Sequence, residues 1–258
     1  DQRMSRGLGD VYKRQGFSDA SSDSGEVYLY KFDDGDFTNA TLIGRIGKGY
    51  TGNNDLDISS IGKADKFGRS VSFDSTGSRL VVGATGDDGN NNNSVANAGA
   101  VYLITFTDSN GNASTDFENP AHVGTIGVGY NDNTREDYDI TAYLDDNDQF
   151  GGHLGLTKDG KILAVGAQND DGFGNGVDNG GAVHLIQFDD SNFSNVVGHA
   201  RIGNGYSGTN DYDTSSISGW KAAQVAIDGD GNRLAIGHHN EEDAVSYTHL
   251  RAHETSVD

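Results

Sequence analysis

The sequence predicts an all-β fold assembled from repeated units of short strands, and three observations lead to this prediction. Glycine is abundant, with 38 residues in a chain of 258, whereas only 34% of the residues are hydrophobic. Similar apolar strings recur roughly every 75 to 83 residues, and acidic turns follow them. Apolar residues alternate with small or polar ones, and helical spacing appears nowhere over a useful length. Many short strands joined by tight turns would produce this composition.

Three strings mark the repeat. The first is GEVYLYKF at 25–32, GAVYLITF at 99–106 and GAVHLIQF at 181–188. The second is RIGKGY at 45–50, TIGVGY at 125–130 and RIGNGY at 201–206. The third is FGRSVSFDSTGSRLVVGA at 67–84, which returns as FGGHLGLTKDGKILAVGA at 150–167. These strings divide residues 16–244 into a half-unit at 16–66, complete units at 67–149 and 150–220, and a partial unit at 221–244.

The two ends of the chain do not fit the repeat. Residues 1–15 contain VYKRQ and residues 245–258 contain SYTHLRAHET, and both strings resemble translated sequencing-adapter sequence. We therefore expect both segments to be non-native and exclude them from the fold, with genuine disordered tails as the alternative. Residues 16–244 are expected to be an interior piece of a larger exported protein.

The strands of a unit can be assigned in order. SVSF at 70–73 alternates apolar and small residues, which is typical of a strand with one packed face and one small or polar face. DSTGS at 74–78 has a glycine where a tight hairpin needs a positive φ. LVV at 80–82 and VYLITF at 101–106 are apolar on both faces, which predicts strands that are buried on both sides. Gly83 then ends the second strand because a bulkier residue would collide with a neighbouring backbone.

Four short antiparallel strands per unit is the number in a β-propeller blade, whose first strand lines the central channel. The sequence therefore predicts about three blades of four antiparallel strands, which form part of a ring. A β-sandwich with chance similarity between its hairpins is the alternative.

The chain also resembles a known family. FG at 67–68 and 150–151, GA at 83–84 and 166–167, and the strands around them resemble FG-GAP repeats, the blades of integrin-type (integrin-alpha-like) β-propellers. The added IGxGY and Asp-x-Asp segments are most similar to repeats in giant exported adhesin-like proteins of Gram-negative bacteria. The resemblance implies an extracellular or cell-surface scaffold that presents loops to a protein or glycan ligand.

The last unit departs from the family pattern. Lys221 falls at the phenylalanine position and Ala222 at the glycine position of the FG pair. We expect Trp220 to supply the lost packing from one residue away.

Charge and composition exclude several classes of function. The formal net charge of -21 repels phosphate backbones and anionic head groups, so we expect no nucleic-acid partner. No apolar run approaches the roughly 20 residues needed to cross a bilayer, so we expect no membrane insertion. The chain has no cysteine and therefore no Cys-ligated zinc site.

The acidic segments after each IGxGY string are candidate calcium sites. Each contains two aspartates separated by one residue, so on an extended segment their carboxylates point to the same side. The pairs are Asp55 with Asp57, Asp137 with Asp139, and Asp211 with Asp213. Calcium prefers such oxygen ligands, but the same acids would also cap turns and solvate an exposed loop.

The hairpin loops are weaker candidates for calcium. In integrin-type blades this loop can hold calcium, but here it is shorter and lacks the last acidic ligand. Only Asp228, Asp230 and Asn232 in the third hairpin keep the alternating spacing of carboxylate and amide side chains. We read the other hairpins as turns.

No catalytic motif stands out, and we expect a binding or structural module that is not an enzyme. Carboxylate pairs are guaranteed by 39 acidic residues, and His122, His153, His184 and His199 fall at unrelated positions. The sequence has neither a nucleophile elbow nor a phosphate loop. A polysaccharide-active propeller enzyme, a lyase or a glycosidase, is the alternative, since its site would be assembled from several blades.

Overall fold

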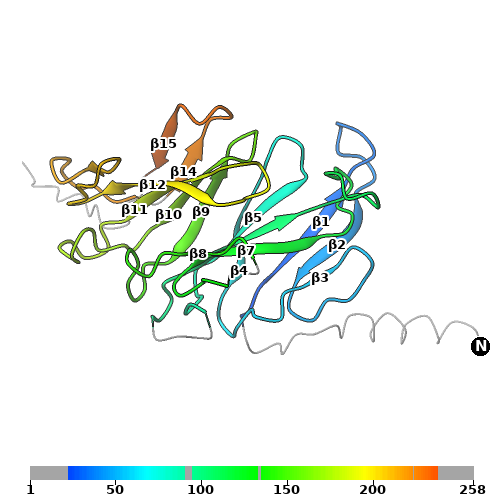
Figure 1. Ribbon diagram of the computed structural model, residues 1–258, viewed down its shortest axis with the longest axis horizontal. Helices are drawn as coiled ribbons and strands as arrows, with labels where there is room; N and C mark the ends of the chain where they lie inside the picture. Colours follow the sequence, from blue (N-terminus) through cyan, green and yellow to red (C-terminus); the bar gives the residue numbers. More distant parts are fainter. Residues whose placement is uncertain (1–22, 91–94, 133–134, 223, 238–258) are drawn as a thin grey trace, which may run out of the picture.

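The computed structural model of the protein describes residues 23–90, 95–132, 135–222 and 224–237. Within these residues the regular structure consists of strands in four sheets, and no helix is present. The sheets follow one another in chain order across the molecule, as Figure 1 shows. The all-β prediction is confirmed, and the sheets correspond to complete and partial propeller blades. The two flanking segments predicted to be non-native, 1–15 and 245–258, lie outside the described residues.

Two of the sheets are complete and share one topology. The first contains β4 (Phe67–Phe73), β5 (Arg79–Ala84), β6 (Ala100–Thr105), β7 (Ala121–Gly127) and β8 (Tyr138–Asp139). The second contains β9 (Phe150–Leu156), β10 (Ile162–Ala167), β11 (Ala182–Phe188), β12 (Val196–Gly203) and β13 (Tyr212–Asp213). In both, the first four strands form an antiparallel meander, and the fifth pairs in parallel with the fourth. The short fifth strand was not predicted, and it arises because the Asp-x-Asp segment folds back along the IGxGY strand.

The other two sheets are partial. At one end, β1 (Glu26–Lys31), β2 (Thr41–Gly47) and β3 (Leu56–Asp57) correspond to the three outer strands of a complete sheet. At the other end, β14 (Gln224–Ile227) and β15 (Leu234–Gly237) correspond to the two inner strands. The described part of the chain thus holds two complete blades between an outer half-blade and an inner half-blade.

The core lies between consecutive sheets. Every residue of β5 and of β10 after the first is buried, which confirms the prediction of strands covered on both faces. Val81 and Leu103 of the first complete sheet belong to the same buried cluster as Leu163 of the second. On its other face, Leu80 and Tyr102 share a cluster with residues of the half-blade. The first complete sheet is therefore stabilised by burial of apolar surface against both of its neighbours.

Gly83 occupies a place where backbones of successive sheets meet. A Cβ atom on this residue would lie 2.0 Å from the carbonyl oxygen of Gly151 in the next sheet. The same oxygen accepts a hydrogen bond from Ser70 Oγ at 2.6 Å. The predicted reason for a glycine at this position is therefore confirmed.

The packed face of β4 is the reverse of the one expected. Ser70 and Ser72 face the next sheet, where Ser72 Oγ accepts a hydrogen bond from the Leu156 backbone at 3.1 Å. Val71 and Phe73 are instead exposed, at 48% and 38%. Their side of the strand faces the half-blade, in which the described residues include no inner strand to cover it.

The FG position of the last sheet is also shifted from its predicted place. The glycines that precede β1 and β6 contact the backbone of Phe67 and Phe150, and the corresponding Gly181 contacts Ala222. Buried Ala222 thus occupies the phenylalanine position that was assigned to Lys221. Trp220 Nε1 donates to the Gly181 carbonyl at 3.2 Å and so anchors this junction from nearby.

Candidate functional site

In two of the three Asp-x-Asp segments, the first aspartate is ion-paired with an arginine. Asp55 Oδ2 lies 2.6 Å from Arg45 Nη2, and Asp211 Oδ2 lies 2.7 Å from Arg201 Nη2. The backbone N–H of each arginine also donates to the same aspartate, at 2.8 Å. Burial alone would raise the pKa of both aspartates, but these hydrogen bonds hold their pKa below the usual value. A cation would have to compete with arginine at these two positions.

The second segment lacks this ion pair because Thr125 stands where the other repeats have arginine. Asp137 accepts hydrogen bonds from the backbone N–H of Thr125 at 2.7 Å and of Asp132 at 3.2 Å. Burial raises the pKa of Asp137, and Arg135 nearby opposes this shift only in part. Among the first aspartates of the three segments, Asp137 is thus the one whose pKa is raised, whereas those of Asp55 and Asp211 are lowered.

The second aspartate of each segment has a different task. Its carboxylate accepts a hydrogen bond from the second glycine of the preceding IGxGY turn. These bonds are Gly49 to Asp57 at 2.6 Å, Gly129 to Asp139 at 2.9 Å and Gly205 to Asp213 at 2.8 Å. The two carboxylates of each pair therefore bind different donors, and these hydrogen bonds tie the loop to the strand before it.

A polar hollow of about 520 Å³ lies beside the second segment. It is lined by Asp132, Arg135, Glu136, Asp137 and Asp139 from the first complete sheet and by Asn195 from the second. The Asn195 N–H donates to Glu136 Oε2 at 3.4 Å across this seam. Among the described residues no three His, Asp or Glu side chains lie close enough together to hold a metal ion. The hollow gathers acidic side chains but leaves them too far apart to form a complete coordination shell.

The third hairpin also separates its candidate ligands. Asp228 Oδ1 accepts from the backbone N–H of Asn232 at 2.8 Å and of Arg233 at 3.1 Å. Asp230 is instead ion-paired with Lys158 of the preceding hairpin. Asp228 and Asp230 thus bind different partners, one within the turn and one in the neighbouring hairpin.

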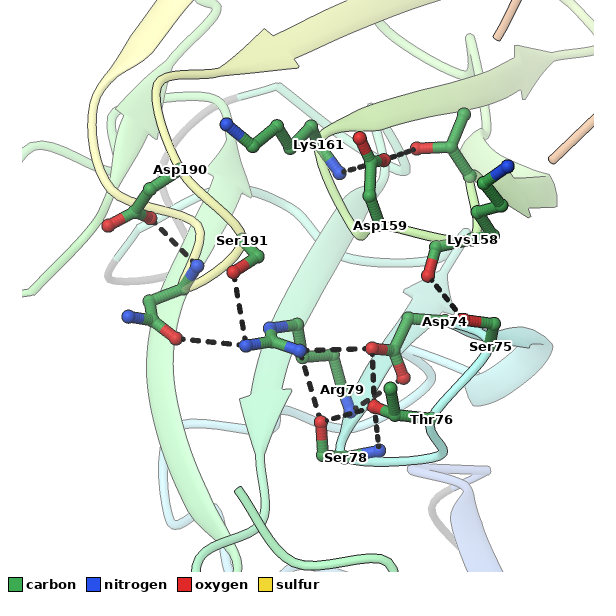
Figure 2. Close-up of polar contacts among 12 residues, drawn as sticks. Asp74, Ser75, Thr76, Ser78, Arg79, Lys158, Asp159, Lys161, Asp190 and Ser191 are labelled. Atoms are coloured by element: carbon green, nitrogen blue, oxygen red, sulfur yellow. Dashed lines mark hydrogen bonds and ion pairs between the residues drawn. The ribbon is translucent and has the colours of Figure 1, made fainter. Parts of the chain in front are cut away.

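The hairpins form a continuous polar edge, part of which Figure 2 shows. Arg79 binds Asp74 of its own hairpin at 3.0 Å and reaches Ser191 and Asn192 of the next sheet, at 3.2 and 3.1 Å. Ser75 Oγ donates to the Lys158 carbonyl at 2.7 Å. The hairpin glycines have φ near +73°, as predicted: Gly77 at 73°, Gly160 at 72° and Gly231 at 73°. This edge is occupied by contacts between blades.

A buried acid pair that the sequence analysis did not single out recurs in both complete sheets. In the first sheet the pair is Asp65 and Asp87. Asp87 accepts hydrogen bonds from the hydroxyls of Tyr102 at 2.8 Å and Tyr130 at 2.9 Å. Burial, with Asp87 close by, raises the pKa of Asp65 to about 7. Burial also raises the pKa of Asp87, against the two hydroxyls.

In the second sheet the corresponding residues are Asp148 and Asp170. Asp170 accepts a hydrogen bond from Tyr206 at 2.7 Å, and His184 replaces the other tyrosine. His184 Nε2 has no hydrogen-bond partner among the described residues and lies 3.8 Å from Asp170 Oδ2. Burial, with Asp170 nearby, raises the pKa of Asp148 to about 8. The recurrence of D-x-F-G at 65–68 and 148–151 was the signal that could have identified these acids.

Two of the histidines, expected at unrelated positions, lie together. His184 Nδ1 and His199 Nε2 are 3.0 Å apart on the neighbouring strands β11 and β12. Burial, with His184 nearby, lowers the pKa of His199 to about 3. Burial and Arg135 lower the pKa of His122 to about 4. The rings of His122 and His199 are therefore neutral near neutral pH and serve as packed polar groups.

Comparison with known proteins identifies the repeat. The family profile of the FG-GAP repeat matches residues 59–104, which include β4, β5 and most of β6. The chain therefore carries an FG-GAP repeat and is a repeat module of the β-propeller type, as its sequence resemblance indicated. No curated protein matches the chain. None of the described residues belongs to a helix that could cross a membrane.

Proposed function

We propose that the chain is a non-enzymatic binding or structural module of a large bacterial surface or secreted adhesin-like protein. In this role the blades are a rigid scaffold, and the loops between them contact a protein or glycan ligand. The observation that supports this proposal is the way the acidic side chains are used. In all three Asp-x-Asp segments they bind backbone N–H groups or arginine and fix the loops in place.

The state of the histidines supports the same proposal. The low pKa values of His122 and His199, about 4 and about 3, follow from burial, so neither ring exchanges a proton readily near neutral pH. Arg79 is bound to Asp74 of its own hairpin and to Ser191 of the next sheet. The contacts of these groups within the fold support a scaffold role for the chain.

Calcium, within this proposal, binds the hollow beside the second segment and not the first or third segment. Asp137 has no arginine partner, whereas Asp55 and Asp211 each have one. Asp132, Glu136 and Asp139 line the same hollow and offer further oxygen ligands. Binding would require these side chains to move together, because their present positions do not form a site for a metal ion.

Glycan and cell binding test the proposed function directly. The full chain would be labelled and applied to immobilised polysaccharides and to intact bacterial and animal cells, and the same polysaccharides would be assayed for new reducing ends and unsaturated products. We expect saturable binding to at least one surface without cleavage. Depolymerisation of any polysaccharide would contradict the proposal and favour a propeller enzyme.

The calcium assignment has its own test. Thermal unfolding would be followed in excess EDTA and in millimolar calcium, with magnesium as a control for charge screening. A ligand that binds only the folded state raises the midpoint by mass action. We expect a calcium-selective rise that Asp137→Asn abolishes and the matched variant Asp211→Asn retains. A rise that is equal in both variants would refute the assignment to the second segment.

A further inference from the structure

The chain contains four pairs in which asparagine is followed by glycine, and such pairs can react with themselves. The pairs are Asn110–Gly111, Asn175–Gly176, Asn179–Gly180 and Asn204–Gly205. The backbone nitrogen of the glycine attacks the side-chain carbonyl carbon of the asparagine, and glycine favours this attack because it has no side chain to hinder it. In a folded protein the attack requires that the glycine N–H is free and that the backbone can rotate.

In three of the pairs the glycine N–H is held by a hydrogen bond. These bonds are Gly111 to the Asp108 carbonyl at 3.0 Å, Gly180 to the Val177 carbonyl at 3.1 Å and Gly205 to Asp213 Oδ1 at 2.8 Å. The attacking nitrogen must lose its proton and turn toward the asparagine side chain, and a hydrogen bond opposes both changes. The bond from Gly205 is the strongest of the three in kind, because its acceptor is a carboxylate.

The fourth pair, Asn175–Gly176, is different. Both residues are exposed, and they lie in the loop that joins β10 to β11 (Figure 1). The N–H of Asn175 donates to the Gly172 carbonyl at 3.1 Å, and the N–H of Val177 donates to the Asp171 carbonyl at 2.9 Å. No hydrogen bond joins the N–H of Gly176 to any acceptor among the described residues. The attacking nitrogen of this pair is therefore free.

The surroundings of Gly176 also leave room for the reaction. Apart from its chain neighbours, the nearest described atom to a Cβ placed on Gly176 would be the Phe173 carbonyl oxygen, at 3.8 Å. Gly174 precedes Asn175, so the reactive asparagine lies between two glycines. Because glycine adopts many backbone conformations, these two residues allow the backbone to rotate until the Gly176 nitrogen faces Asn175 Cγ.

We propose that Asn175 is a site of spontaneous covalent modification, which the free N–H of Gly176 distinguishes from the other three pairs. The Gly176 nitrogen forms a bond to Asn175 Cγ, and the bond from Cγ to Nδ2 breaks. The proton of the Gly176 N–H leaves with the side-chain amide as ammonia, and a five-membered succinimide ring remains. Water then adds to one of the two ring carbonyls and opens the ring. The product is aspartate or isoaspartate, in which the main chain runs through the former side-chain carbonyl.

The modification changes the charge and the shape of this loop. Either product adds one negative charge beside Asp171, and isoaspartate also inserts a methylene group into the main chain. The insertion lies between the hydrogen bonds that Asn175 and Val177 make across the turn. Phe173, which is 63% exposed, lies in the same turn. This chemistry is independent of the proposed binding function, because it requires only the free N–H of Gly176.

Rates of deamidation provide the first test. The full chain would be incubated at mildly alkaline pH, and peptide mass spectrometry would follow the mass increase at each pair. We expect Asn175 to react about two- to tenfold faster than Asn110 and Asn179, which is the effect of one hydrogen bond on a rate. Asn204 should react more slowly still. In urea the four rates should converge, because the unfolded chain retains only the shared Asn–Gly sequence.

Hydroxylamine tests the succinimide ring directly. It attacks a ring carbonyl and cleaves the chain before the glycine, so the sizes of the fragments identify the pair that formed the ring. The folded chain should be cleaved first between Asn175 and Gly176, whereas the chain in urea should be cleaved at all four pairs.

Substitutions test the role of the glycine N–H. Asn175→Gln should abolish the modification, because glutamine would have to form a less favoured six-membered ring, and Asn110→Gln is the matched control that leaves the rate at Asn175 unchanged. Asp213→Ala frees the N–H of Gly205 and should raise the rate at Asn204. Gly176→Ala, at a glycine whose φ is not positive, should slow the reaction at Asn175 and serves where Asp213→Ala fails to fold. Circular dichroism would verify that each variant is folded.

Two results would overturn the proposal. The first is a folded chain in which Asn175 reacts no faster than Asn110 or Asn179, since all three would then be governed by sequence alone. The second is a folded chain that stays unmodified at Asn175 while the same chain in urea reacts there, which would show that the fold protects this pair as well.

Discussion

The two complete blades have the same backbone but neutralise the same buried carboxylate in different ways. Asp87 in the first blade accepts two tyrosine hydroxyls, whereas Asp170 in the second accepts one and lies beside His184. Burial raises the pKa of Asp87. It would raise that of Asp170 as well, but His184 and Tyr206 hold the pKa of Asp170 below its usual value. The repeat therefore specifies a buried acid at this turn and leaves its partners free to differ.

The residues that bind the Asp-x-Asp segments also differ between the blades. The strand before the Asp-x-Asp segment offers arginine in the half-blade and the second blade, and threonine in the first. Arg201 also lies over the rings of Tyr143 and Tyr206, at 4.7 and 4.3 Å from their centroids. The first blade lacks both contacts. The two complete blades thus share one strand topology but differ in their charged contacts. Substitutions at these contacts can measure the contribution of each difference.

The largest expected effect comes from removing apolar packing between the two complete blades. Phe150 is fully buried in the cluster that joins them, and Phe150→Ala should destabilise the chain by about 3–5 kcal/mol. Phe67 occupies the same position against the smaller half-blade, so Phe67→Ala should cost less. Urea unfolding of both variants measures the difference. Equal losses would mean that the half-blade packs as firmly as a complete one.

The next effect distinguishes the two buried acids. Tyr206→Phe removes from Asp170 its side-chain hydroxyl donor, while Tyr130→Phe leaves Asp87 with the Tyr102 hydroxyl. A buried acceptor that loses its donor costs about 1–3 kcal/mol, so Tyr206→Phe should fall in that range and Tyr130→Phe below it. The free energies of unfolding of both variants in urea provide the measurement. The opposite ranking would show that His184 satisfies Asp170 on its own.

The raised pKa of Asp148 predicts a pH dependence. The folded state retains this proton up to about pH 8, whereas the unfolded state releases it near its ordinary value of 3.8. Between these values the folded state binds more protons, so this group makes stability fall as the pH rises. Asp148→Asn removes the penalty and should raise the unfolding midpoint by about 3–8 °C at pH 8, with little change at pH 4.

Asp170→Asn is the control for that experiment. Its carboxyl has a lowered pKa, so the substitution should destabilise the chain most at neutral pH, which is the opposite sign. Midpoints that are parallel for Asp148→Asn and the original chain across this pH range would contradict the prediction.

The strand pattern of the fold could be predicted from the sequence, because backbone requirements leave local signals. The hairpin glycines and Gly83 each mark a place where only glycine fits, and the structure places them there. The exposed face of β4 could not be predicted, because it depends on which strands precede it in space. Alternation alone shows that Val71 and Ser72 lie on opposite faces of the strand, but it does not show which face is covered.

The candidate sites show the same limit. The spacing of Asp137 and Asp139 drew attention to this turn, but the partner of Asp137 depends on Thr125, a residue 12 positions earlier in a neighbouring strand. Asp65 and Asp148 were missed because an aspartate before FG carries no signal of burial by itself. Two left-handed residues flank each of them, Ala64 with Lys66 and Asn147 with Gln149, which shows how tightly the turn encloses the acid.

The smallest expected effect makes the two blades alike. Thr125→Arg places a guanidinium where Arg201 binds Asp211 in the second blade, with Tyr130 in the place of Tyr206 for stacking. The gain from a new ion pair of this kind is about 0.5–1 kcal/mol, reduced by the loss of the Thr125 hydroxyl contact to His122.

The reciprocal variant Arg201→Thr should cost more than Thr125→Arg gains, because it leaves Asp211 buried without its cation. Thr125→Arg should also lower the pKa of Asp137 and abolish any calcium-selective rise of the midpoint, since the arginine would occupy the carboxylate. Unfolding in urea with and without calcium measures both effects in one series. A calcium response that persists in Thr125→Arg would place the ion at another site. The difference between the two blades would then not depend on this one side chain.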